Sequence, residues 1–374
     1  MREPIERHAP SYAKARHGGQ PGSGRKLSLS RQILTALGLS TALTCLPVAV
    51  AHAQPTLDDV QPAVMSAIAH RTLLLDVARA GDRLVAVGTR GHIVYSDDNG
   101  QTWTQAPSPV RQVLTAVYFA DEQHGWAVGH DALILHSSDG GESWELQYRD
   151  PALSDPDEVD SLLERPLMDV WFRDAQTGFA VGAYGIFLRT DDGGQNWDDV
   201  SFDIDNEDGF HYNAISAIPD TGLFLVGEMG TMYRSFDFGD TWETLEDLPY
   251  DGSWFGVSGT TEPEVVLTWG LRGNMYRSDD FGDTWEQVEL NTPNNGPLEA
   301  TLSGGHLSDD GRLVVVGLGG TVVSSSDNGR SFEVMTRPDR MALASAKPLP
   351  DGSVLLLGQR GAMKAAANGL NPGN

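Results

Sequence analysis

Three arginines occupy the same position of a turn that recurs along the chain, and their chemistry suits binding. The turn has the pattern G-x-x-G in six copies and G-x-x-A in a seventh, and its second variable position is Arg90, Arg272 or Arg360 in three of them. A guanidinium group can bind a carboxylate through two parallel hydrogen bonds, so such a patch fits acidic peptide segments. The alternative is that these are ordinary solvated arginines that pair with nearby acids.

Other variable positions of the same turns extend the predicted surface for a partner. They add His130, Tyr184 and Glu228. All of these turns are expected to lie on one rim of the molecule, which also receives the connections between repeats. We therefore predict that the rim binds a protein partner.

No residue pattern indicates catalysis. Sialidases need an arginine cluster with a tyrosine nucleophile and carboxylates, and their Arg-Ile-Pro type motif is absent from this sequence. Glycosidases need a pair of carboxylic acids across a cleft, which cannot be inferred among so many acids. The histidines show no metal-ligand spacing, and no nucleophile motif is present. We expect no enzymatic activity, no metal and no cofactor.

A second motif, the Asp-box S/T-x-D-x-G-x-x-W/F, follows six of the turns. Its aspartate can accept backbone N–H bonds and close a tight turn, its glycine supplies a positive φ, and its aromatic residue is expected to pack between repeats. Metal binding is the alternative, but one carboxylate per repeat cannot surround a Ca²⁺ ion. The aspartates are Asp98, Asp139, Asp192, Asp237, Asp280 and Asp327, and the aromatic residues are Trp103, Trp144, Trp197, Trp242, Trp285 and Phe332.

The elements that must position these residues are short strands in a repeat of about 45 residues. The first glycines of the turns are Gly88, Gly129, Gly182, Gly227, Gly270, Gly317 and Gly358, with spacings of 41, 53, 45, 43, 47 and 41 residues. The aromatic residue follows each of the first six glycines by 15 residues. Four strands in each such repeat predict an all-β protein, a single seven-bladed β-propeller of antiparallel blades over residues 54–366.

The ends of the repeat array and one insertion need separate predictions. The seventh repeat has no Asp-box, so we expect the segment around Pro62–Ile68 to close the ring as its outer strand. Residues 367–374 are expected to form a disordered tail. The acidic insertion 150–165 is expected to be a surface loop or a short helix.

The N-terminal region predicts export. Basic residues between positions 25 and 31 precede an apolar run over 33–50, which ends in Ala51-His52-Ala53. This order is typical of a signal peptide, so residues 1–53 are interpreted as a polar leader and a signal cleaved near Ala53. A membrane anchor is the alternative, but the run is short and contains Gly38 and Pro47. The periplasm is the expected location.

Removal of residues 1–53 leaves a strongly acidic chain. They hold seven basic and two acidic residues, so 19 basic and 50 acidic residues remain, with a net charge of −31. Such a surface repels phosphate backbones and anionic lipids, so we expect neither nucleic-acid binding nor insertion into a membrane. The single cysteine, Cys45, lies in the signal and fits a lipoprotein signal poorly because Thr44 precedes it.

The repeat resembles that of the photosystem II assembly and stability factor family. The similarity is carried by the segment 169–197, which contains DVWF and GFAVG before its Asp-box, and by its echo at 116–129. The resemblance implies a lumenal or periplasmic propeller that binds precursor protein chains and carries an arginine patch, which maps here onto Arg90, Arg272 and Arg360. Whether the host is photosynthetic stays open.

Two classes of function follow. The favoured one is an exported, non-enzymatic scaffold, expected to be a monomer, that helps a membrane protein complex to assemble. The alternative is a carbohydrate-active propeller, either a sialidase-like or xyloglucanase-like hydrolase or a glycan-binding relic. An arginine-bearing channel mouth favours the scaffold, and a mouth with aromatic residues and paired carboxylates favours the alternative.

Overall fold

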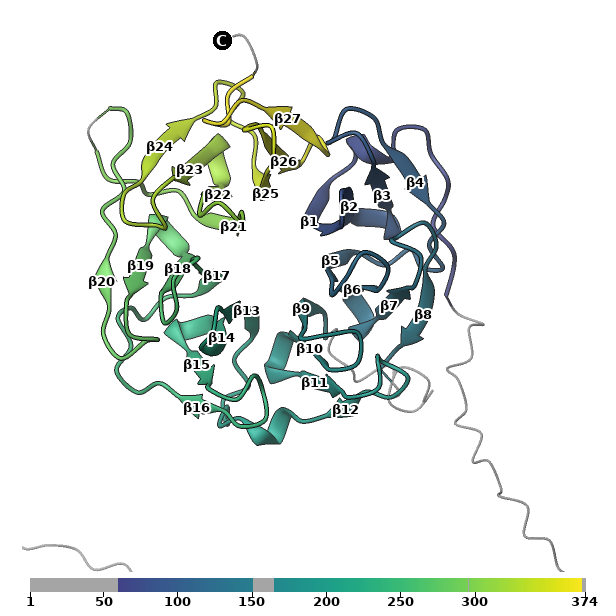
Figure 1. The fold of residues 1–374 in the computed structure, drawn as a ribbon, viewed down its shortest axis with the longest axis horizontal. Coiled ribbons are helices and arrows are strands. Elements are labelled where there is room, and N and C mark those ends of the chain that lie inside the picture. Colours follow the sequence, from purple (N-terminus) through teal and green to yellow (C-terminus); the bar gives the residue numbers. More distant parts are fainter. Residues whose placement is uncertain (1–59, 151–164, 295, 372–374) are drawn as a thin grey trace, which may run out of the picture. The chain divides into compact units, whose positions relative to one another are not determined.

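The computed structural model describes residues 60–150, 165–294 and 296–371, which form a ring of seven antiparallel sheets around a central axis (Figure 1). The predicted all-β, seven-bladed propeller is confirmed. The predicted signal peptide and most of the predicted insertion, 151–164, lie outside the described residues. The side chains of Arg165 and Asp150 form an ion pair at the base of that insertion.

The first strand of each blade lies innermost, next to the central axis, and the last strand lies at the outer wall of the ring. The first four blades contain β1 (Leu74–Ala80), β2 (Arg83–Gly88), β3 (Ile93–Ser96) and β4 (Thr104–Ala106); β5 (Leu114–Phe119), β6 (Gly125–Gly129), β7 (Ile134–Ser137) and β8 (Glu145–Tyr148); β9 (Leu167–Phe172), β10 (Gly178–Gly182), β11 (Phe187–Thr190) and β12 (Asp198–Asp199); and β13 (Tyr212–Ile218), β14 (Gly222–Gly227), β15 (Met232–Ser235) and β16 (Glu243–Thr244).

The last three blades follow the same order. They contain β17 (Trp254–Gly259), β18 (Val266–Gly270), β19 (Met275–Ser278) and β20 (Glu286–Gln287); β21 (Leu302–Leu307), β22 (Leu313–Gly317), β23 (Thr321–Ser325) and β24 (Glu333–Thr336); and β25 (Leu343–Pro348), β26 (Val354–Gly358) and β27 (Met363–Ala365). Short 3₁₀ turns connect some strands, namely η2 (Ala69–Arg71), η3 (Thr89–Gly91), η4 (His130–Ala132), η7 (Ala183–Gly185), η8 (Ser201–Asp203), η9 (Glu228–Gly230), η10 (Leu271–Gly273) and η11 (Leu318–Gly320).

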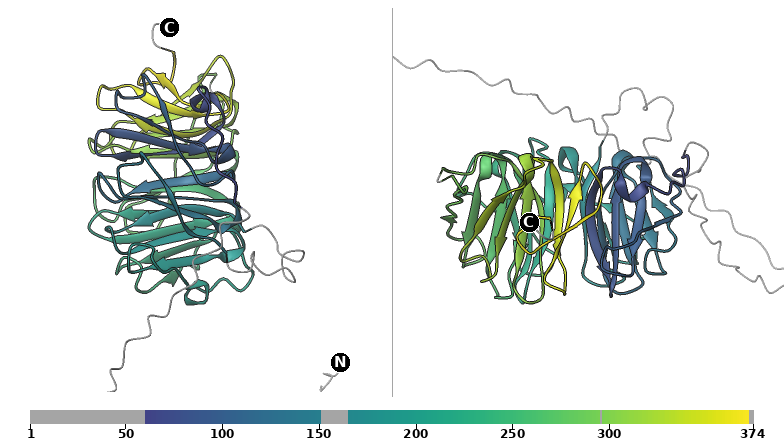
Figure 2. Two further views of the ribbon diagram at one scale, coloured as in Figure 1. Left: turned by 90° about the vertical axis from the view of Figure 1, so that its right-hand side faces the viewer. Right: turned by 90° about the horizontal axis from the view of Figure 1, so that it is seen from above.

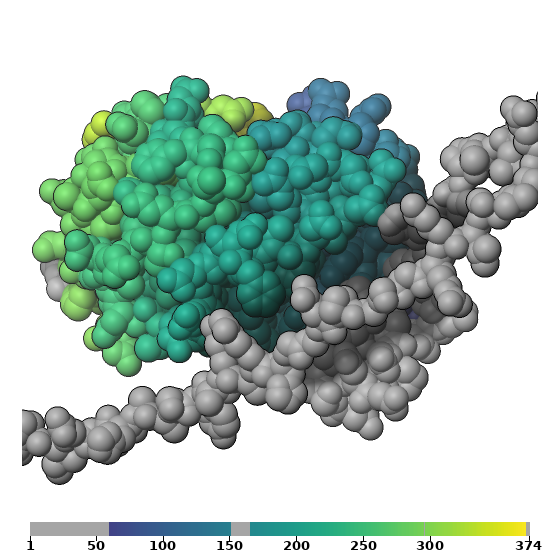
Figure 3. All heavy atoms as spheres, turned by 90° about the horizontal axis from the view of Figure 1, so that it is seen from below, coloured from purple at the N-terminus to yellow at the C-terminus, as the bar shows by residue number. Residues whose placement is uncertain are grey.

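Consecutive strands pair within each blade, so the two ends of the blades carry different turns (Figure 2). The G-x-x-G turns join the second and third strands, and the connections between blades reach the same end; we call this end the GxxG face. The Asp-boxes and the turns between the first and second strands lie at the other end, the Asp-box face. At the outer wall the blades meet side by side, as the teal and green surfaces of blades 3 to 5 show (Figure 3).

Every innermost strand carries a one-residue bulge near its start. In blade 3, for example, Leu167 pairs with Gly182 and Asp169 with Val181, so Met168 is unpaired. The glycine is required because a Cβ at Gly182 would lie 2.2 Å from the carbonyl oxygen of Pro166. The first glycine of every other G-x-x-G turn meets the equivalent carbonyl at 2.0–2.4 Å. The repeated glycine in the sequence thus reports a close contact with the neighbouring strand.

The Asp-boxes form side-chain networks. In the first box, Asp98 accepts hydrogen bonds from the N–H groups of Gln101 and Thr102 at 2.9 and 2.8 Å, three and four residues on rather than two or three. The Ser96 hydroxyl donates to Asp98 and accepts from Gly100 N–H, and Gly100 has a φ of 80°. The box aromatic residues pack into the apolar clusters between neighbouring blades.

The ring closes by packing rather than by a shared strand. Blade 7 has three strands, and the segment 62–68 lies on blade 1, where Ala63 N–H donates to the Ser108 carbonyl. This differs from the predicted closure by an outer strand. The segment does not pair with β27 because its backbone is bound to blade 1, where the Gln105 side chain bonds to Ser66 N–H and to the Val64 carbonyl. Side chains of β1, β2 and β3 instead pack against Leu349, Leu355 and Leu357 of blade 7.

The C-terminal residues 367–371 take part in the fold, whereas the sequence analysis placed them in a tail. The Arg337 guanidinium, only 3% exposed, donates hydrogen bonds to the Gly369 carbonyl and the Asn371 side chain. Gly369 lies directly against Val322 of β23. The segment therefore covers the outer end of the contact between blades 6 and 7.

Candidate partner-binding face

The G-x-x-G turns hold large side chains in a conformation that few residues adopt. In six turns the second variable residue has a φ between 53° and 66°, and the next residue, which is a glycine in five turns and Ala132 in the other, is also left-handed. In the first turn the His92 N–H donates to the Thr89 carbonyl, which makes a type I′ turn around Arg90 and Gly91. A non-glycine residue in this region costs about 1–2 kcal/mol. Arg90, Tyr184, Met229 and Arg272 are nevertheless found there.

The three arginines of the sequence analysis all lie on the GxxG face and are exposed. None of them forms an ion pair with a described residue. Arg360 lies in blade 7, which is next to blade 1 with Arg90. Arg272 lies in blade 5, two blades from Arg360. The pKa of Asp339 is lowered mainly by its hydrogen bond with Arg337, and Arg360 contributes to that shift.

Arginines on the Asp-box face have a different role, since they join neighbouring blades. Arg234 of blade 4 donates to the Phe281 carbonyl and to Asp283 of blade 5 at 3.0 and 2.7 Å. Arg83 and Arg189 make equivalent pairs of contacts with the next blade. The guanidinium groups of these clamps are therefore already used by the fold, unlike those of the GxxG face.

Two other predicted residues meet around a histidine. Tyr184 of blade 3 contacts the His211 ring edge-to-face at 4.7 Å, and Glu228 of blade 4 accepts the His211 N–H at 3.2 Å. His130 lies in the turn of blade 2 and has an interaction partner of its own. The structure thus brings Tyr184 and Glu228 together on the GxxG face, apart from the arginine-bearing blades 7 and 1.

Exposed apolar side chains gather at the same face. Tyr184, Met229 and Leu318 on the turns are 46%, 58% and 48% exposed, and Phe202, on the connection between blades 3 and 4, is 96% exposed. Of the large exposed apolar residues in the described ranges, only Phe236, in an Asp-box, belongs to the opposite face. Tyr184, Met229 and Leu318 lie on G-x-x-G turns, Phe202 and Leu248 on connections between blades, and Phe255 along the channel. Val64, Met65 and Ile68 belong to the segment 62–68 on blade 1.

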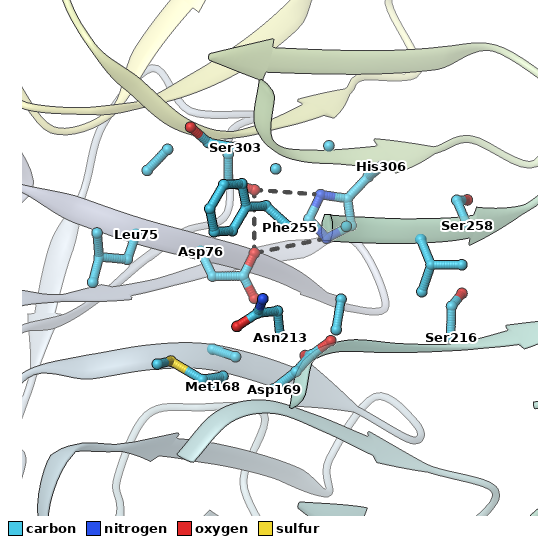
Figure 4. A pocket seen from close by; sticks show the side chains of 18 of the residues that line it. Leu75, Asp76, Met168, Asp169, Asn213, Ser216, Phe255, Ser258, Ser303 and His306 are labelled. Atoms are coloured by element: carbon cyan, nitrogen blue, oxygen red, sulfur yellow. Dashed lines mark hydrogen bonds and ion pairs between the residues drawn. The ribbon is translucent and has the colours of Figure 1, made fainter. Parts of the chain in front are cut away.

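A channel of about 1090 Å³ runs between the innermost strands and reaches the turn residues Leu318 and Gln359 (Figure 4). The seven bulge residues form its outer ring, namely Leu75, Thr115, Met168, Asn213, Phe255, Ser303 and Ala344. The residues that follow them form a second ring, namely Asp76, Ala116, Asp169, Ala214, Gly256, Gly304 and Ser345.

Polar groups of these rings connect neighbouring blades. The Asp76 carboxylate accepts the Val117 N–H of blade 2 at 3.1 Å, and the Asp169 carboxylate accepts the Ile215 N–H of blade 4 at 2.9 Å. Burial raises the pKa of both aspartates, and the pKa of Asp169 reaches about 7. Both carboxylates therefore contribute to the fold as well as to the wall of the channel.

Asp76, His306 and Ser345 are close together but do not form a catalytic triad. The Ser345 hydroxyl donates to Asp76 at 3.2 Å rather than to the histidine. His306 Nδ1 lies 3.0 Å from the Ala346 carbonyl, so this nitrogen carries its proton and cannot act as a base for Ser345. Burial lowers the pKa of His306 to about 3, which keeps the ring neutral.

The channel combines features of both functional classes that the sequence analysis left open. Arg90, Arg272 and Arg360 lie on the face at which the channel opens, and the carboxylates of Asp76, Asp169 and Asp309 line it together with Phe255. The sequence analysis missed these inner residues because only the bulge turns two successive residues toward the axis. The described residues contain no group of three potential metal ligands. They also contain no helix with the length and hydropathy needed to cross a bilayer.

The blade structure and its six boxes define the class of the protein, an Asp-box β-propeller. Residues 94–105 match the BNR/Asp-box repeat. The profile described as "Photosynthesis system II assembly factor YCF48" matches residues 106–163 and 152–305, more than half of the chain. The chain therefore belongs to this photosystem II assembly factor family.

Curated relatives share part of the sequence. The chain is 31% identical to the photosystem II assembly lipoprotein Ycf48 of Synechococcus sp. (strain CC9902) over 38% of its own length and 43% of that protein. It is 37% identical to the chloroplastic photosystem II stability/assembly factor HCF136 of Cyanidioschyzon merolae over 21% of its length and 19% of that protein. The chain thus matches less than half the length of these relatives.

A solved structure titled "YCF48 bound to D1 peptide" has the same fold. It aligns with a TM-score of 0.59 at 19% identity and covers 79% of this chain and 93% of that one. This similarity supports the seven-bladed architecture across nearly all the described residues.

Proposed function

We propose that the protein is an exported assembly factor that binds a polypeptide segment of a membrane protein on its GxxG face. The observation that carries this proposal is the difference between the two faces. Arginines of the Asp-box face clamp neighbouring blades, whereas Arg90, Arg272 and Arg360 are exposed and form no ion pair with a described residue. Family membership supports the assembly role, and a relative in the family binds a D1 peptide.

The chemistry of the face indicates the kind of segment it would bind. Although the chain as a whole is negatively charged, its exposed guanidinium groups can bind carboxylates of a partner segment locally, in bidentate pairs. Apolar residues such as Met229 and Phe202 would contact the apolar side chains of the same segment. Exposed apolar surface of this kind is typical of interaction sites. The partner-binding set is Arg90, Arg272, Arg360, His130, Tyr184 and Glu228.

Export forms part of the same proposal. The mature protein would begin after Ala53 and act as a monomer in the periplasm. Two curated relatives are named lipoproteins, so acylation at Cys45 is the competing route. The intact mass of the protein purified from its host distinguishes the two, because a lipid-modified chain starting at Cys45 would contradict cleavage at Ala53.

A pull-down with a matched control tests the binding face. The mature chain, the triple variant Arg90→Ala/Arg272→Ala/Arg360→Ala and the control Arg79→Ala/Arg173→Ala/Arg330→Ala would be incubated with solubilised host membranes. The control removes the same charge from the Asp-box face, where exposed ion pairs contribute only about 0–1 kcal/mol. We expect wild type and control to retain the same membrane protein and the triple variant to lose it. Retention by the triple variant, or no membrane protein with wild type, would contradict the proposal.

A further inference from the structure

The channel contains a carboxylate, that of Asp169, for which the described residues provide no ion-pair partner. Asp169 accepts two backbone N–H bonds, from Val170 and Ile215, but forms no ion pair with a described residue. Burial is the main cause of the raised pKa of Asp169. The other carboxylate in the second ring, Asp76, lies close enough to raise it further. A buried carboxylate without a cation is costly while it is charged, so it either takes up a proton or is stabilised by a bound cation.

Asp76 is better compensated than Asp169. Lys347 lies toward the other mouth of the channel and acts electrostatically on Asp76, and Ser345 donates to it. His306 Nε2 lies 3.8 Å from Asp76 but is neutral. The unmet charge is therefore concentrated on the Asp169 side of the channel.

Aromatic groups flank the same side. Tyr118 and Trp171, from the inner strands of blades 2 and 3, line the channel. Trp171 is 7% exposed. Elsewhere in the wall, Trp269 of blade 5 has a buried indole N–H with no acceptor among the described residues. Such an unpartnered donor indicates a ligand that also offers an oxygen atom, such as a peptide carbonyl. Aromatic rings and carboxylates together are a common way to hold an ammonium or guanidinium group.

The mouth at the GxxG face admits such a group. Phe255 in the outer ring is 37% exposed, and Leu318 and Gln359 of the turns line the entrance. The second ring is narrow only where the carboxylates project, because blades 2, 4, 5 and 6 contribute Ala116, Ala214, Gly256 and Gly304. A long side chain can therefore reach Asp169 from the docking face.

We propose that the channel binds the basic side chain, lysine or arginine, of a polypeptide docked on the GxxG face, with Asp169 as its counter-ion. The statement that a docked partner presents this side chain rests on the proposed function. The channel itself can be tested without any partner. The partner segment would then carry acidic groups for the rim arginines and one basic group for the channel.

A small-molecule titration tests the channel directly. Nα-acetyl-arginine methylamide and its neutral citrulline counterpart would be titrated into the mature chain and followed by ligand-observed NMR. We expect the arginine compound to bind at millimolar concentration and the citrulline compound to bind at least tenfold more weakly. Asp169→Asn should weaken arginine binding at least tenfold, and Asp82→Asn, an exposed carboxylate outside the channel, should leave it unchanged. Equal binding of the two compounds, or no effect of Asp169→Asn, would overturn the proposal.

A second pair of variants tests the channel without an added ligand and without a substitution of Asp169. Ser216 lines the channel next to Ile215, whose N–H binds Asp169. Ser216→Lys would place a tethered ammonium near Asp169, whereas Ser216→Gln would add bulk without charge. We expect a higher Tm for Ser216→Lys than for Ser216→Gln at pH 8, and the opposite order would contradict the channel's preference for a cation. If these tests fail while the pull-down succeeds, the docking face stands and only the channel proposal falls.

Discussion

At the scale of single residues, the Asp-box aspartates should stabilise the turns without contributing to binding. Asp192 accepts the Asn196 N–H and the Asn196 side-chain amide at 2.9 and 2.7 Å. Asp192→Ala should destabilise the protein by about 1–2 kcal/mol, since it removes hydrogen bonds to a charged acceptor. Thermal unfolding of this variant, compared with that of Asp82→Ala, measures the effect. Asp82 is an exposed aspartate with no side-chain hydrogen bond or ion pair to a described residue. Equal Tm values for both variants would show that the box is dispensable.

The raised pKa of Asp169 predicts a pH dependence of stability. Its pKa is about 7 in the folded protein, mainly because of burial, and near 4 in an unfolded chain. Between these values the folded state binds the extra proton, so this group makes the protein less stable as pH rises from about 4 to about 7. Asp169→Asn should therefore gain Tm relative to wild type as pH increases across that range.

The charged groups around Asp169 do not reverse this expectation. Asp76 also has a raised pKa, whereas that of His306 is lowered to about 3 and that of Lys347 to about 8. His306 makes both proteins more stable as pH rises from about 3 to about 6.5, so its effect cancels in the difference. A Tm difference between Asp169→Asn and wild type that is the same at pH 4.5 and pH 7.5 would contradict the raised pKa.

The residues of the boxes could be predicted from sequence, but those of the channel could not. An Asp-box works through contacts within four residues, so its spacing is visible in the chain itself. Asp76 and Asp169 acquire their role only when seven strands meet around an axis. Nothing in their local sequence distinguishes them from the other acids of the chain.

At the scale of elements, the first glycine of each G-x-x-G turn should be essential because of the bulge it faces. A Cβ at Gly182 would clash with the backbone carbonyl of Pro166, and no side-chain movement can relieve that contact. Gly182→Ala should cost more than about 2 kcal/mol, in the range of strained core substitutions. Chemical denaturation measures this cost.

Gly296→Ala is the matched control for that substitution, because a Cβ there meets no atom within 4 Å. We expect a change of less than about 0.5 kcal/mol for this variant. A small effect of Gly182→Ala would mean that the inner strand can give up its bulge. The two rings of channel residues would then not depend on the bulges of the innermost strands.

The closure of the ring shows the limit of prediction for elements. The repeat correctly indicates a missing outer strand in blade 7, but it does not indicate what takes its place. Val64 and Met65 resemble strand residues in sequence, yet the side chain of Gln105 binds the backbone of this segment to blade 1. Arg337 fixes the C-terminal segment by its bond to Gly369. Both contacts depend on tertiary structure.

At the scale of the whole molecule, the two faces differ in what their side chains contact. Arginine clamps and boxes on the Asp-box face join the blades, while the GxxG face presents arginines without an ion pair among the described residues, strained turn residues and apolar side chains. Backbone strain that persists at exposed, large residues is typical of functional surfaces. The seven-fold repeat predicted the two rims, but the difference in their charge pairing became clear only from the contacts between blades.

Site-specific photo-crosslinking tests the claim that the GxxG face binds the partner most directly. A photoreactive phenylalanine analogue would replace Tyr184 on the GxxG face or Phe236 on the Asp-box face, which are 46% and 59% exposed. The account predicts that position 184 crosslinks to the membrane protein retained in the pull-down and that position 236 does not. Crosslinking at position 236 with none at 184 would contradict it and would place the partner on the opposite face.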